Sequence, residues 1–161
     1  MEIDCGFTKG DRWFRYRAAG IIVEDGYVLF AGNDRDDYLY SVGGGVHVGE
    51  SAEEAVVREV FEETGVKYEV DRLAFIHENF FEGDGGTIDK LHCHELTFYF
   101  LMKPRGTREL SGHSVTSDGV AEHMHWIPVE DLGKRTAYPT FLPEKLGDLQ
   151  PGIEHIVTHE N

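Results

Sequence analysis

One stretch, residues 41–66, constrains the fold of this chain more than any other, because three consecutive glycines lead into a segment crowded with glutamates. Ser51 can cap the N-terminus of a helix, and Glu54, three residues later, completes a capping box. Gly65 suits the position just beyond a helix C-terminus. The stretch therefore predicts a glycine-rich turn followed by one long helix between Ser51 and Gly65.

The charges on this predicted helix gather on one side. At about 100° per residue, Glu59, Glu62 and Glu63 fall on one face together with two alanines, while the valines and Phe61 are expected to pack into the core. Carboxylates this close are unfavourable unless cations neutralise them. Hard oxygen ligands of this kind suit Mg²⁺, Mn²⁺ or Ca²⁺. The alternative is a solvated acidic helix behind a glycine-rich turn.

Length and composition limit the classes of protein to consider. A chain of 161 residues matches one domain, and its formal net charge of -15 argues against a nucleic-acid duplex as partner. A bound divalent cation can still reverse the local field and admit an anionic small molecule. Cys5 and Cys93 do not make a disulfide framework, and no segment is long and apolar enough for a membrane span or a signal peptide. We expect a cytoplasmic protein with reduced thiols.

Strand patterns surround the helix. Asp25-Gly26 between two apolar runs predicts a hairpin. A short helix, interrupted by Pro143, is expected within 140–147. The pattern favours an α+β or three-layer arrangement with a mixed sheet. The predicted strands are 14–23, 27–32, 37–42, 66–81, 92–102, 122–129 and 153–159.

The spacing of residues 44–66 adds a family to this description. From Gly44 onward the residues match GX5EX7REUXEEXGU, with U aliphatic, at every fixed position, so the chain resembles the Nudix (MutT-like) hydrolase family. The resemblance implies an α/β fold in which helices sandwich a mixed β-sheet (α/β/α). It also implies that residues 1–161 form a single domain with a core of about 14–158.

Nudix enzymes hydrolyse a diphosphate linked to another moiety, X. The resemblance implies that Glu59, Glu62 and Glu63 hold Mg²⁺ or Mn²⁺ together with a carbonyl at or next to Gly44. Such ions bridge phosphate oxygens and activate the attacking water.

Two further box residues have roles in the family. The arginine at the position of Arg58 orients the metal-binding glutamates, and the glutamate at the position of Glu50 usually ties the loop to the helix. In this chain Arg58 can pair with Glu50, Glu54 or Glu62.

The general base is left open among four glutamates: Glu59, Glu78, Glu95 and Glu122. Glu95 stands out because it interrupts an apolar strand, where a carboxylate is rarely left unpaired. We expect it to act in catalysis; the alternative is an ordinary hydrogen-bonded residue.

Four residues outside the box are candidate substrate contacts: Arg17 and Arg35 for phosphate, and Phe80 and Tyr138 for stacking on a base. Surface ion pairs and core packing are the alternatives. The predicted substrate is a (d)NTP or oxidised (d)NTP; ADP-ribose or a nucleotide sugar comes second, and a catalytically silent nucleotide-binding domain is the alternative from another class. Many family members dimerise, so a homodimer is compatible with the sequence.

Overall fold

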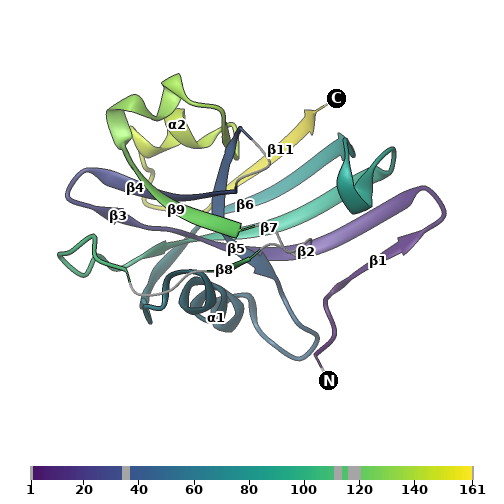
Figure 1. Cartoon of the computed structure of the whole chain (residues 1–161), viewed down its shortest axis with the longest axis horizontal. Helices are drawn as coiled ribbons and strands as arrows, with labels where there is room; N and C mark the ends of the chain where they lie inside the picture. Colours follow the sequence, from purple (N-terminus) through teal and green to yellow (C-terminus); the bar gives the residue numbers. More distant parts are fainter. Residues whose placement is uncertain (1, 34–36, 111–113, 116–120, 161) are drawn as a thin grey trace.

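A computed structural model describes residues 2–33, 37–110, 114–115 and 121–160. A long mixed sheet forms the middle of the molecule, with α1 against one face and α2 on the other (Figure 1). The strands are β1 (Gly6–Lys9), β2 (Arg12–Ile21), β3 (Val23–Glu24), β4 (Tyr27–Asn33), β5 (Leu39–Gly45), β6 (Val70–Glu82), β7 (His92–Met102), β8 (Ser114–Val115), β9 (Ala121–Pro128), β10 (Ala137–Tyr138) and β11 (Glu154–Glu160). The helices are α1 (Ala52–Thr64), α2 (Leu142–Leu146) and the 3-10 turns η1 (Gly86–Ile88) and η2 (Val129–Lys134).

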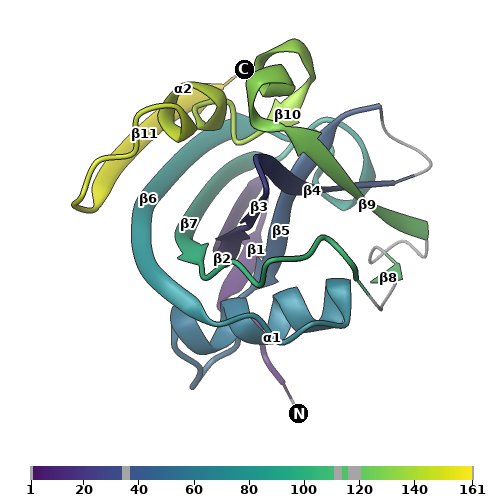
Figure 2. The same ribbon diagram turned by 90° about the vertical axis from the view of Figure 1, so that its left-hand side faces the viewer.

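The strands follow one another in the order β11-β6-β7-β2-β5-β4-β9-β8. The β2–β7 and β11–β6 pairs are parallel, and β6–β7, β2–β5 and β4–β9 are antiparallel. Figure 2 shows β6 and β7 curving around one side while β4 and β9 stand on the other. The mixed sheet between helices confirms the expected fold class, and each predicted strand range overlaps one of these strands, with ends that differ by up to four residues except at 92–102, which matches β7.

Local signals account for the ends of these elements. Asp25 and Gly26 both adopt positive φ, 50° and 80°, in the turn between β3 and β4, as the Asp-Gly hairpin prediction requires. Ser51 and Glu54 form the complete capping box, and Gly65 ends α1 in the left-handed conformation. Pro143 does not interrupt α2; it lies in the first turn, where its missing N–H is not needed.

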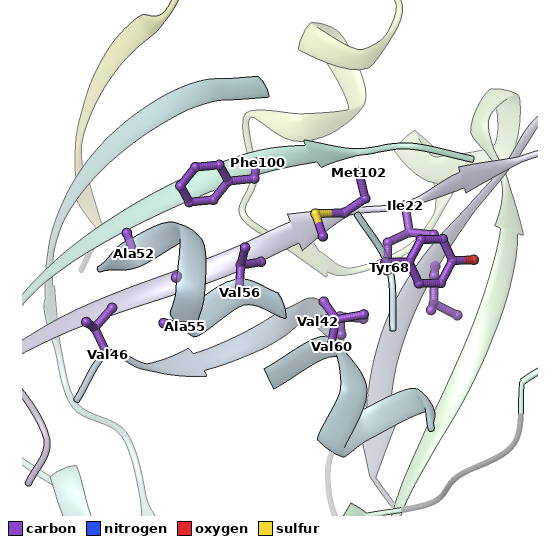
Figure 3. Packing of buried hydrophobic residues seen from close by; sticks show 12 residues of the cluster. Ile22, Val42, Val46, Ala52, Ala55, Val56, Val60, Tyr68, Phe100 and Met102 are labelled. Carbon is purple, nitrogen blue, oxygen red and sulfur yellow. The ribbon is translucent and has the colours of Figure 1, made fainter. Parts of the chain in front are cut away.

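The face of α1 that contacts the sheet is made of small residues, which let the helix pack close to the strands. Ala52 and Ala55 are buried in the core beside Val56 and Val60 (Figure 3), so the alanines do not floor a solvent-facing acidic surface. Phe61 is 50% exposed, contrary to the prediction that it packs into the core. It lies about 160° around the helix from the middle of the buried face and therefore points to solvent.

The three glycines also differ from the prediction, because they continue β5 rather than forming a turn. Gly43, Gly44 and Gly45 pair with Ala19, Ala18 and Arg17 of β2. The strand passes so close to β2 that Gly43 has no room for a side chain. A Cβ on Gly43 would meet the backbone oxygen of Ala18 at 2.3 Å. Among the described residues, no helix is both long and apolar enough to cross a membrane.

Candidate active site

Helix α1 brings two of its glutamates in against β5. The Glu59 side chain is only 15% exposed, and Glu63 as a whole is 8% exposed. Glu62, which shares their side of the helix wheel, is 56% exposed. A Cβ on Gly44 would lie 2.4 Å from the carboxyl carbon of Glu59, so glycine at this position leaves the room that the carboxylate occupies. The predicted carboxylate face therefore exists, with Glu62 at its outer rim.

Arg58 ties this face to the strand–helix loop. Its Nε and Nη2 donate to the two carboxylate oxygens of Glu50 at 2.8 and 3.0 Å, and Nη2 also donates to the Gly45 carbonyl at 3.0 Å. Its Nη1 donates to Glu59 at 2.8 Å and reaches Glu62 at 3.3 Å. This arginine lowers the pKa of Glu50 to about 2. Of the partners expected for Arg58, Glu50 and Glu62 are found, whereas Glu54 is engaged in the helix cap.

A further carboxylate, Glu122 of β9, meets Glu63 across the fold. Glu122 is buried, and its Oε2 accepts a hydrogen bond from the Tyr40 hydroxyl at 2.8 Å. Burial, followed by the neighbouring Glu122 charge, raises the pKa of Glu63 well above its ordinary value. The Oε2 atom of Glu63 has no hydrogen-bond partner within the described residues. Two adjacent buried carboxylates are stable together only with a proton or a cation between them.

The donor set fits a hard divalent cation. Its members are carboxylates, one of them with an unused buried oxygen, and Gly44 lets the Glu59 carboxylate come up against the strand. In the part of the chain that the structure describes, no three His, Cys, Asp or Glu side chains already converge as a finished metal site. One reason is the position of Glu62: its carboxylate pairs with Arg58 and would have to turn inward to reach a metal ion beside Glu59 and Glu63.

A cavity of about 470 Å³ lies on the sheet face opposite α1. Tyr40 connects it to the carboxylates, because this residue lines the cavity and also binds Glu122. Arg17 is fixed beside it, donating to the Ser41 hydroxyl at 3.1 Å and to the Ser41 carbonyl at 2.9 Å. The lining residues are Arg15, Arg17, Tyr38, Tyr40, Ser41, His77, Asn79, Phe81, Glu82, Asp84, Ile88, Glu95, Tyr99, Tyr138, Pro139 and Glu160.

The four predicted substrate contacts are not brought together. Arg17 and Tyr138 line the cavity, and Tyr138 is 40% exposed at its margin. Phe80 points to the opposite face, where it stacks on His94 and His159 at 4.3 and 4.8 Å between ring centroids. Its neighbour Phe81 lines the cavity instead, because successive residues of a strand point to opposite faces of the sheet. Arg35 lies outside the described residues.

The candidate general bases Glu95 and Glu78 lie on opposite faces of the sheet. Glu95 lies on the cavity floor, directly opposite Arg15 of β2 and Asn79 of β6. Glu78 is on the other face and pairs with His155 at 2.8 Å, away from the cavity.

Three polar residues of the cavity are not among the site residues predicted from the sequence: Tyr40, Ser41 and Asn79. Strand alternation counted from Arg17 and Glu95 would have placed polar residues of β6 on this floor, but only with the β6–β7 register known.

Comparison with known proteins assigns the class. Residues 14–146 match the NUDIX domain family, and the chain belongs to that family. It is therefore a hydrolase that acts on pyrophosphate bonds, in a family that acts on small nucleotide-type substrates and generally uses divalent metal ions.

Individual relatives agree with this assignment. A MutT-like protein of Streptomyces ambofaciens is 28% identical over 145 residues, which cover 88% of this chain and 81% of the relative. The MutT protein of Methanosarcina mazei Go1 superposes with a TM-score of 0.64 at 19% identity, covering 86% of this chain and 96% of that one. An ADP-ribose pyrophosphatase of Streptococcus suis superposes with a TM-score of 0.57 at 16% identity, covering 89% and 98%. At these identities the structural likeness establishes the fold.

Proposed function

We propose that this protein uses Mg²⁺, with Mn²⁺ as a substitute, to hydrolyse the diphosphate linkage of a nucleoside diphosphate derivative such as a (d)NTP or an oxidised (d)NTP. The observation that carries this proposal is the buried carboxylate cluster. Glu59, Glu63 and Glu122 gather at one place, burial and the neighbouring Glu122 charge raise the pKa of Glu63, and one Glu63 oxygen lacks a partner within the described residues. An arrangement of this kind favours the binding of a hard cation beside a cavity that carries arginines.

The metal ligands would be Glu59, Glu63 and Glu122, joined by Glu62 and the Gly44 carbonyl. When bound, a divalent ion polarises a phosphate oxygen and lowers the pKa of water. Arg58 holds the Glu59 carboxylate in place, and the same guanidinium anchors the loop through Glu50. The protein thus prepares the negative side of the site before any substrate arrives.

The cavity residues would hold the substrate. Arg17, fixed on Ser41, presents its guanidinium to phosphate oxygens, a task suited to its planar donor fork. Glu95, which lines the same cavity, would contact the substrate and accept a proton from it or from a bound water. Tyr138 and Tyr38 meet edge to face at 5.4 Å and offer aromatic surface at the cavity margin.

A second substrate class is favoured by one observation. The cavity adjoins a larger hollow of about 760 Å³, and both are lined by Arg15, Tyr38 and Glu95. A substrate with a bulky X, such as ADP-ribose or a nucleotide sugar, would fit such a double hollow better than a triphosphate does. The Streptococcus suis neighbour is itself an ADP-ribose pyrophosphatase.

A substrate panel tests the proposal. The panel contains dNTPs, oxidised dGTP, ADP-ribose and nucleotide sugars, each with Mg²⁺, with Mn²⁺ and with EDTA. We expect at least one substrate to be cleaved at its diphosphate, with loss of turnover in EDTA and recovery on addition of metal. The Glu63→Gln variant serves as the matched inactive control. Failure of the whole panel with both metals would count against hydrolysis and favour a nucleotide-binding domain.

A further inference from the structure

A row of polar residues crosses the cavity floor, one from each of four neighbouring strands. Arg15 of β2 lies opposite Glu95 of β7, Glu95 lies opposite Asn79 of β6, and Asn79 lies opposite Thr158 of β11. Directly opposed residues of neighbouring strands point to the same face of a sheet. Three of the four line the cavity, so the row is available to whatever the cavity holds.

Asn79 is held in this row by hydrogen bonds from two sides. The Thr158 hydroxyl donates to Asn79 Oδ1 at 2.7 Å, and Asn79 Nδ2 donates to Glu160 Oε2 at 3.2 Å. His77 Nε2 lies 2.7 Å from the same Thr158 oxygen. Thr140 donates to the other carboxylate oxygen of Glu160 at 3.1 Å. The chain His77–Thr158–Asn79–Glu160 therefore joins β6 to β11 beneath the cavity.

The proton positions along this chain follow from its acidic end. A carboxylate only accepts, so Glu160 requires the Nδ2 side of Asn79, which leaves Oδ1 facing Thr158. The single hydroxyl proton of Thr158 then goes to Asn79, so His77 must donate its Nε2 proton to Thr158. Burial lowers the pKa of His77 to about 4, which keeps the ring neutral, and the bond to Thr158 assigns its one ring proton to Nε2. The Asn79 amide is thus fixed in one orientation.

The fixed amide shares the cavity floor with a second acceptor, Glu95, which is the directly opposed residue of β7. Asn79 Oδ1 retains a second lone pair, and Asn79 Nδ2 retains a second proton. Arg15 supplies balancing positive charge on the far side of Glu95. A ligand group that reaches both Asn79 Oδ1 and Glu95 is therefore favoured if it donates hydrogen bonds, and an isosteric carbonyl oxygen in its place would face these two acceptors.

We propose that Asn79 is a specificity-determining residue that favours a nucleobase with an exocyclic amino group, and that Thr158 and His77 are positioning residues that act through it. This inference rests on the proposed function in one respect only, that the cavity holds a nucleotide. The selectivity comes from the donor and acceptor pattern, because a site built to pair a polar group discriminates strongly against an analogue that cannot pair.

Binding of nucleoside 5′-monophosphates tests the inference, since these compounds have no anhydride bond to hydrolyse. The matched pairs are CMP and UMP, AMP and IMP, and GMP and IMP, measured by titration calorimetry with Mg²⁺ present. We expect the amino member of at least one pair to bind about tenfold more tightly, or better, as the loss of one hydrogen bond to a charged or fixed group implies. Asn79→Leu should bring that ratio close to one.

Two further variants distinguish positioning from folding. Thr158→Val keeps the shape of the side chain and should shrink the ratio even if the protein stays fully folded. Val157→Thr, the neighbouring change on the exposed face of β11, is the matched control and should leave the ratio unchanged. Wild-type ratios near one in every pair, a preference for the members that lack the amino group, no measurable nucleotide binding, or an unchanged ratio in Asn79→Leu would each overturn the inference.

The same measurements separate this inference from the proposed hydrolysis. Selective binding that depends on Asn79, combined with failure of the substrate panel, would reject the hydrolytic proposal and keep the specificity residue. Turnover of panel substrates combined with unselective binding would do the opposite.

Discussion

Replacing Gly44 with alanine perturbs the candidate site by about one ångström. The added Cβ would stand 2.4 Å from the Glu59 carboxyl carbon and 2.5 and 2.6 Å from its two oxygens. Ordinary van der Waals contact begins near 3.4 Å, so the carboxylate must retreat by roughly 1 Å. A displacement of about 1 Å in a catalytic constellation can cost about 100-fold in rate. We expect kcat/KM of the Gly44→Ala variant to fall by about that factor.

The effect on folding should be smaller, because Glu59 is a flexible side chain that can move aside. Overpacking costs about 1–3 kcal/mol, and we expect the lower end. Gly45→Ala is the matched control, since the atoms nearest to its Cβ would be those of the Asp4 carboxylate, at ordinary contact distances of 3.4 Å and more. The assays are steady-state turnover and urea unfolding of both variants. Wild-type turnover in a folded Gly44→Ala variant would contradict the placement of Glu59 against Gly44 and its role in the site.

Three other predictions concern Glu62 at the rim of the carboxylate face, His77 in the hydrogen-bond chain beneath the cavity, and the buried Glu24. Glu62→Gln should lower kcat by at least about 100-fold with an unchanged melting temperature; near wild-type turnover would remove Glu62 from the metal site. For His77, whose pKa falls from 6.5 to about 4 on folding, the unfolded chain binds more protons between these values, so stability is lost as pH falls through this window. Melting curves from pH 7 to 4 should show a shallower loss for His77→Gln than for the wild type, and equal slopes would contradict the lowered pKa. Buried Glu24 accepts hydrogen bonds from the Tyr68 hydroxyl and two backbone N–H groups, so Glu24→Ala should cost about 3 kcal/mol or more in urea unfolding; an unchanged free energy of unfolding would show those donors to be satisfied elsewhere.

Features that depend on short stretches of chain were predictable. The capping box of Ser51, the stop at Gly65 and the Asp25-Gly26 turn each involve residues within a few positions of one another. Their side chains and backbone angles determine the outcome before any tertiary contact forms. The same is true of the pairing between Arg58 and Glu62, which is set by helical spacing.

Features that depend on how distant segments meet were not predictable. Glycines read as a turn became a strand, because β2 and α1 leave no space for side chains at Gly43 and Gly44. The helical wheel alone does not tell which side of α1 meets the sheet, so the prediction places Phe61 in the core although its side chain is exposed. The choice between Phe80 and Phe81 depends on the register of β6 with β7, a shift of one residue.

The additional carboxylate of the candidate site illustrates the same limit. Glu122 was one of several glutamates considered for the base, and nothing near it in the chain singles it out. Its contact with Glu63 arises because β9 pairs with β4, which leaves it beside Tyr40 of β5. Similarly, the chain from His77 to Glu160 exists only because β11 pairs in parallel with β6 across about eighty residues of sequence.

The most direct test of the central claim is the binding of Mn²⁺ to the protein, measured by electron paramagnetic resonance without substrate. If the buried carboxylates form the metal site, the wild type should bind Mn²⁺, and Mg²⁺ should compete for the same site. Glu63→Gln and Glu122→Gln should each weaken binding by at least about tenfold while the protein remains folded. Equal Mn²⁺ affinity in the wild type and in both variants would contradict the assignment of these carboxylates to a divalent metal.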